Sequence, residues 1–198
     1  MSLELWNTFA TFGTFLVISA TAIAAIAQLR HARGSNQIAA INELRETGER
    51  AEFRAAQHFV VTQLPAKLHD PAFRYQVVNR TARTTENGLL IDQALSLGNF
   101  YESMAILVRD GLVDRELALE IWNGIVVRMW EALVPFTAVL RRELGSIVWE
   151  NFEYLTVISQ DWLVAHSNGT YPAGMRRIDL KDDWLEADAH YAASLATA

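Results

Sequence analysis

The chain has 198 residues, a formal net charge of −6 at pH 7 and no cysteine. Its arginines are interleaved with acidic residues instead of forming the basic face that nucleic-acid-binding proteins carry, so we expect no nucleic-acid partner. The absence of cysteine excludes disulfides, thiolate nucleophiles and cysteine metal sites.

An apolar segment without a charged side chain occupies residues 5–29. A helix needs roughly 20 apolar residues to cross the hydrocarbon core of a membrane, so this segment predicts a single transmembrane anchor in contact with lipid. The competing interpretation is a cleaved signal peptide, because Ala25-Ile26-Ala27 has the small-x-small pattern of a cleavage site. Signal peptides have a basic start and a shorter apolar region of about 7–15 residues, whereas Glu4 is the only charge before this segment, so the anchor is favoured.

Basic residues follow the apolar segment directly. Arg30, His31 and Arg33 form a predicted inner-leaflet basic cluster, and no Lys or Arg precedes the segment. Because basic residues mark the cytoplasmic side of a membrane helix, we expect the N-terminus outside and the C-terminal domain in the cytoplasm.

Small residues recur at steps of three and four along one face of the predicted membrane helix. Lipid is as apolar as leucine, so helices in membranes associate through close backbone approach at such small residues. We call this face the seam and expect it to contact a second copy or another membrane protein; the alternative is that alanine is simply tolerated in such a helix. The seam consists of Ala10, Gly13, Val17, Ala20, Ala24 and Ala27.

A second helix is predicted over about residues 36–64, after a hinge at Gly34-Ser35. If the helix instead runs on from the anchor without a break, the seam continues into Ile38 and Ile41 as a short coiled coil. Packing of the same apolar stripe on the core of its own domain explains the pattern equally well.

The rest of the chain has helical periodicity and no convincing strand-like alternation. Asp70 before Pro71 starts a helix, Pro135 is expected to kink a helix without ending it, and Gly145-Ser146 separates the last two long helices. A polar break is expected over residues 84–88. The predicted helices cover about 71–83, 89–110, 114–144, 146–168 and, in the tail, 182–192.

This pattern predicts an all-α protein with a single N-terminal transmembrane helix, followed by an antiparallel bundle of about five helices. The expected domains are an anchor with its basic junction over residues 1–33, a helical cytoplasmic domain over 34–168 and a partly ordered tail over 169–198.

Three carboxylates, Glu102, Glu131 and Glu153, stand beside aromatic residues on their predicted helices. If they converge in an apolar bundle, they form a carboxylate cluster that could bind a metal or carry a proton. Glu–Arg pairs that lock neighbouring helices leave the same pattern, and we favour this interpretation because no histidine ligand or nucleophile accompanies the three. The sequence contains no Glu-x-x-His, His-Glu-x-x-His, phosphate-binding glycine loop or Gly-x-Ser-x-Gly, so it predicts no catalytic residue, metal or cofactor.

Several short motifs occur together with the apolar segment and the basic junction. They are Tyr101-Glu102, Asp110 to Leu112, Trp130-Glu131 with Pro135, Arg141-Arg142 and Phe152-Glu153. In these features the chain resembles a widespread bacterial family of unknown function. The resemblance covers most of residues 5–160 and implies one N-terminal transmembrane helix, a helical cytoplasmic domain and a place in the bacterial inner membrane; it implies no activity or substrate.

We therefore expect a membrane-anchored helical interaction module without evident catalytic activity, which assembles with itself or serves as an accessory subunit of a larger membrane complex. Two alternatives belong to other classes. One is an enzyme or a metal or proton site built on the three carboxylates, and the other is a small oligomeric pore or membrane effector formed by the anchor.

Overall fold

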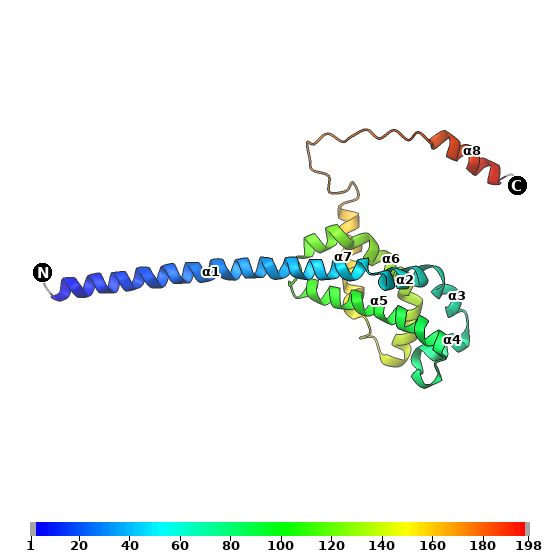
Figure 1. The fold of residues 1–198 in the computed structure, drawn as a ribbon, viewed down its shortest axis with the longest axis horizontal. Coiled ribbons are helices and arrows are strands. Elements are labelled where there is room, and N and C mark those ends of the chain that lie inside the picture. The colour runs from blue at the N-terminus through cyan, green and yellow to red at the C-terminus, as the bar shows by residue number, and fades with distance from the viewer. Residues whose placement is uncertain (1–2, 197–198) are drawn as a thin grey trace. The chain divides into compact units, whose positions relative to one another are not determined.

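The computed structural model describes residues 3–196 and is all-α over that range, with no strand (Figure 1). A long apolar N-terminal helix is followed by several packed helices, which confirms the predicted fold class. The chain divides into two compact units, Met1–Ser167 and Asn168–Ala198. The elements are α1 (Leu3–Glu49), α2 (Ala51–Thr62), α3 (Leu64–Leu68), α4 (Pro71–Val78), the 3₁₀ turn η1 (Arg80–Ala82), α5 (Thr85–Arg109), α6 (Arg115–Leu144), α7 (Glu150–Ala165) and α8 (Leu185–Ala196).

Helix α1 continues through Gly34-Ser35 without a break, so the predicted hinge is wrong. One glycine in a helix interior costs only about 1 kcal/mol relative to alanine, and the residues on both sides propagate the helix. The break comes instead at Arg50, whose backbone is extended (φ −62°, ψ 141°). The single helix predicted over residues 36–64 is therefore the end of α1 followed by α2.

Side-chain caps set the starts of three later helices. Asp70 accepts a hydrogen bond from the Ala72 N–H (2.8 Å), as its place before Pro71 predicts. Asp114 caps α6 in the same way through the Leu117 N–H (2.9 Å). Thr84 accepts from the N–H of Asn87 (3.3 Å), so the polar stretch predicted as a break is the cap and first turn of α5.

Helix α6 passes through Pro135, as predicted, and ends at Gly145, whose positive φ of 91° favours glycine. Helix α7 begins at Glu150, four residues later than the Ser146 start that the sequence suggests. Its N-cap is Trp149, which adopts a left-handed backbone conformation (φ 56°, ψ 37°). Contacts with Asn99 and Gly98 of α5 hold this tryptophan in place.

The core of the first unit lies between α2, α5, α6 and α7, and the end of α1 covers part of it. Phe152 of α7 stacks on Tyr101 of α5 (ring centroids 4.8 Å apart) and meets the edge of Trp130 of α6 (5.0 Å). Leu44 of α1 is buried in this core, and Ile41 is partly buried against it. The second unit carries α8, which is the short tail helix that the sequence predicts, shifted by a few residues.

Candidate functional site

Two of the described helices, α1 and α6, are long and apolar enough to cross a membrane. Helix α6 has its apolar residues in the protein core, including Leu133 and Phe136. The apolar part of α1 has no such cover: none of its most apolar stretch is buried within the chain. By length and composition, the apolar part of α1 suits a membrane anchor or a signal sequence.

The seam of α1 is open over its described part. Gly13, Val17, Ala20, Ala24 and Ala27 are all exposed, and a Cβ added at Gly13 would meet no described atom within 4 Å. Ala10 lies in the helix, but its side chain falls outside the described residues. The structure therefore leaves the seam exposed from Gly13 to Ala27, and no other described part of the chain covers this stretch.

The seam and the domain occupy different sides of α1. At 3.6 residues per turn, Leu44, which packs into the core, lies roughly 140° around the helix from Gly13. Ile38 lies within roughly 20° of the seam and is 62% exposed. The sequence left two explanations for the apolar stripe after Gly34: an extension of the seam, or packing on the core of the same domain. Packing on the domain holds for Ile41 and Leu44, whereas Ile38 lies on the seam face and is exposed.

The basic cluster lies where α1 leaves its apolar stretch. Arg30 and His31 are exposed on the helix, and the side chain of Arg33 lies outside the described residues. Exposed basic groups at this point suit an interface between hydrocarbon and water.

Glu102 caps α7 from a neighbouring helix. Its carboxylate accepts hydrogen bonds from the N–H of Phe152 (2.8 Å), from the Asn151 side-chain amide (2.6 Å) and from the Asn151 N–H (3.4 Å). Arg109 holds the other side of Asn151 by donating to its Oδ1 (2.5 Å). A carboxylate at the first turn of a helix satisfies free N–H groups and complements the helix dipole.

Trp149 is fixed immediately before that cap. Its indole N–H donates to Oδ1 of Asn99 (3.0 Å), and its ring lies against Gly98, where a Cβ would overlap it. Sequence analysis did not single out Trp149, Asn151 or Gly98. Their partners lie about 50 residues away in the chain, and no local pattern identifies such a pairing.

The other two carboxylates are placed differently. Glu153 forms an ion pair with Arg141 (2.7 Å), whose Nε also donates to the Val148 carbonyl (2.9 Å) and whose guanidinium lies over Trp130. Glu131 is exposed on α6. Glu102 and Glu153 therefore each contact a different partner set, and both sets tie α7 to a neighbouring helix.

Among the described side chains, no group of three or more His, Asp or Glu residues is arranged to hold a metal ion. His58, His69 and His190 are exposed, and His166 stacks on Trp162 of its own helix. The structure thus offers no ligand set around the three carboxylates.

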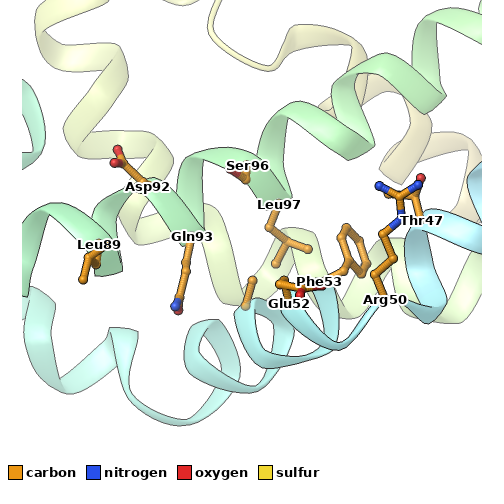
Figure 2. Close-up of a pocket in the computed structure, with 10 residues that line it drawn as sticks. Thr47, Arg50, Glu52, Phe53, Leu89, Asp92, Gln93, Ser96 and Leu97 are labelled. Carbon is orange, nitrogen blue, oxygen red and sulfur yellow. The ribbon is translucent and has the colours of Figure 1, made fainter.

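A groove of about 550 Å³ runs between α5 and the junction of α1 with α2. Figure 2 shows Phe53 and Leu97 in the space between the helices, with polar side chains around them. Asp92, one of its two acidic residues, is paired with Arg83 (3.2 Å). The groove has apolar walls and a polar rim, and its residues form no nucleophile–base pair of the kind that catalysis needs. Its lining residues are Thr47, Arg50, Glu52, Phe53, Ala56, Leu89, Asp92, Gln93, Ser96 and Leu97.

Comparison with known families identifies the chain. The domain of unknown function DUF4760 matches residues 15–159, so the chain belongs to this family. No curated protein and no solved structure gives a significant match. The match begins inside the apolar part of α1 and ends inside α7, so it includes both the apolar helix and the helices packed behind it.

Proposed function

We propose that this member of the DUF4760 family is a membrane-anchored helical interaction module that assembles with itself through α1. The observation that carries the proposal is the exposed apolar surface of α1, with its seam turned away from the attached domain.

The first step is membrane insertion. Eight large apolar side chains between Phe12 and Leu29 are more than half exposed. Full burial of such a side chain is worth about 1.5–3 kcal/mol. The sum, on the order of 10–20 kcal/mol, equals or exceeds the whole stability of a typical domain, so water is a poor environment for this helix. A bilayer removes the cost, because α1 satisfies its own backbone hydrogen bonds.

The second step is orientation. Arg30 and His31 follow the apolar stretch, and the residues before it carry only Glu4. The positive-inside rule then places the helical domain in the cytoplasm and the N-terminus outside, in the inner membrane if the source is bacterial. Because α1 continues unbroken into the core at Leu44, the domain is attached to the membrane helix without a flexible linker.

The third step is self-association. The seam provides small residues for close helix contact, and the domain lies roughly 140° away around α1. Two copies can therefore pair along Gly13 to Ala27 with their domains on the outside of the pair. Ile38 extends the contact beyond the membrane surface, as an apolar residue left exposed on the same face.

Membrane anchoring is tested by alkaline extraction of membranes that contain the full chain, followed by intact-mass measurement. We expect the protein to stay in the membrane pellet at its full mass of 22.2 kDa. A shortened chain that begins after Ala27 would identify a signal sequence and overturn the proposal. Release of the full-length chain by alkali would overturn it as well.

Self-association is tested with two matched variants in mild detergent, using the mass of the protein in the particle as the readout. The seam variant combines Ala20→Leu with Ala24→Leu, and the control combines Ala22→Leu with Ala25→Leu on the other side of α1. We expect the seam variant to become monomeric and the control to remain a homo-oligomer. Equal particle masses for the seam variant and the control would show that the seam does not mediate association. Stoichiometric foreign chains in every particle would make the protein an accessory subunit.

A further inference from the structure

The turn between α5 and α6 lies beside α1 near the end of its apolar stretch. Residues of the turn and of α1 line one hollow of about 490 Å³: Asn36, Gln37, Asp110, Gly111, Leu112 and Asp114. This neighbourhood brings part of the helical domain close to the place where α1 would leave the membrane.

Helix α5 runs antiparallel to α1 along the whole contact. Leu97 lines a groove with Thr47, and further along α5 Leu107 lines a hollow with Ala40 and Leu44. The turn at Gly111 then reaches Asn36. The C-terminal end of α5 is therefore the end of the domain that is nearest to the apolar stretch of α1.

The distance along α1 from the end of its apolar stretch to the α5–α6 turn is short. Asn36 comes seven residues after Leu29, which is a rise of about 10 Å at 1.5 Å per residue. The headgroup layer of a bilayer is about 5–7 Å thick on each side, and membrane helices tilt by about 20° on average. A side chain that projects from the turn toward the bilayer is thus within reach of the headgroups.

Leu112 is the apolar side chain of this turn that remains exposed. It is 57% exposed, while the next residue, Val113, is fully buried and anchors the turn. The N–H groups of Leu112 and Val113 both donate to the Leu107 carbonyl (2.9 and 3.0 Å), and Gly111 supplies the left-handed conformation (φ 72°) that the turn requires. The fold therefore holds an apolar side chain outward on a well-bonded turn.

The carboxylates of the turn have hydrogen-bond partners close by. Asp110 accepts a hydrogen bond from Arg109 (2.9 Å), which lowers the pKa of the Asp110 carboxyl, and Asp114 is engaged as the cap of α6. Since the turn has no unmatched positive patch, attraction to anionic lipid is not its main means of membrane contact. An apolar contact suits a zwitterionic surface equally well.

We propose that the α5–α6 turn is a second membrane contact, in which Leu112 enters the headgroup layer of the leaflet from which α1 emerges. The proposal rests on the membrane anchoring of α1 proposed above. Two contacts, α1 and the turn, would fix the orientation of the domain relative to the bilayer, whereas a single helix leaves it free to rotate.

The cysteine-free chain allows a direct test with single cysteines carrying an environment-sensitive fluorophore. The full-length protein is reconstituted into phosphatidylcholine vesicles that contain lipids with a quencher on the upper acyl chain. Ile23→Cys reports on anchoring, Leu112→Cys reports on the turn, and Leu89→Cys, an exposed leucine near the other end of α5, is the matched control. Circular dichroism checks that each variant keeps its helix content.

We expect strong quenching at Ile23→Cys, clear quenching at Leu112→Cys and none at Leu89→Cys. Quenching at Leu112→Cys no greater than at Leu89→Cys, with Ile23→Cys still quenched, would overturn the second contact and leave the anchor intact. Loss of quenching at Ile23→Cys would instead show that anchoring itself fails. The two proposals therefore fail in distinguishable ways.

Discussion

The indole ring of Trp149 lies directly on the backbone of Gly98 in α5. Gly98 stands one helical turn before Glu102, whose carboxylate accepts hydrogen bonds from the first turn of α7. Trp149 is almost fully buried and is the one non-glycine residue with a positive φ among those described. A left-handed backbone costs a non-glycine residue roughly 1–2 kcal/mol. Its ring contact with Gly98, its stack on Phe136 and its hydrogen bond to Asn99 offset that cost.

Substitution of Gly98 should therefore destabilise the domain. In Gly98→Ala the new methyl group overlaps the Trp149 ring, and overpacking of this kind costs about 1–3 kcal/mol. Gly124→Ala is the matched control, because that helical position has open space and alanine favours the helix by up to about 1 kcal/mol. Urea unfolding of the full-length protein in detergent measures both. Equal stability of the two variants would mean that the ring is not held on Gly98.

Removal of the Glu102 charge should weaken the attachment of α7. Glu102→Gln keeps the shape of the side chain but loses the charge that faces the N–H groups of Asn151 and Phe152. We expect a loss of about 1–2 kcal/mol in the free energy of unfolding. Glu131→Gln, on an exposed site, should change it by less than about 0.5 kcal/mol. A large loss of stability in Glu131→Gln with none in Glu102→Gln would show that Glu131, and not Glu102, is the carboxylate that stabilises the fold.

Alkaline pH should destabilise the domain through Tyr101. Burial raises the pKa of Tyr101 to about 12 from its ordinary value of 10.0, and a hydrogen bond from Gln57 opposes this in part. Between these two pH values the unfolded chain releases the phenol proton and the folded chain keeps it, so stability falls as pH rises. From pH 8 to pH 11 the loss of folding free energy due to Tyr101 is on the order of 1 kcal/mol.

Tyr101→Phe isolates that contribution. The variant loses the Gln57 hydrogen bond, at a cost of about 1 kcal/mol, but has no phenol to titrate. The stability advantage of the wild type should therefore narrow between pH 8 and pH 11, as measured by urea unfolding at each pH. A constant difference over that range would show that Tyr101 does not titrate as its burial requires.

Local patterns predicted the helices well where a cap or a stop stands in the chain. Asp70, Asp114 and Gly145 act at the positions that their residue types suggest. The apolar period also identified α5, α6 and α7 as core helices. These features depend only on neighbours a few residues apart, which is why they can be read from the sequence.

Boundaries without a local signal were missed. Gly34 stays helical because its flanking residues carry the helix across it, while the break at Arg50 follows from the packing of α2 on α5. The late start of α7 depends on Trp149 filling the space above Gly98. Both are tertiary effects that override local propensity.

The candidate site shows the same division. The seam and the exposed apolar stretch of α1 depend on periodicity, and the structure leaves them on a free surface. The roles of Glu102 and Glu153 depend on partners in other helices, so the sequence left their interpretation open. The angle around α1 between Leu44 and Gly13 is defined only because one unbroken helix carries both residues, and the sequence did not fix that continuity.

Disulfide crosslinking in native membranes tests self-association through the seam most directly. Single cysteines at Ala24, on the seam, and at Ala22, roughly 160° around the helix, are oxidised with copper phenanthroline. A disulfide requires the two Cα atoms to approach within about 7 Å, which only the contacting faces of paired helices allow. The account predicts a crosslinked dimer for Ala24→Cys and none for Ala22→Cys. A dimer at Ala22→Cys instead, or at neither position, would contradict it.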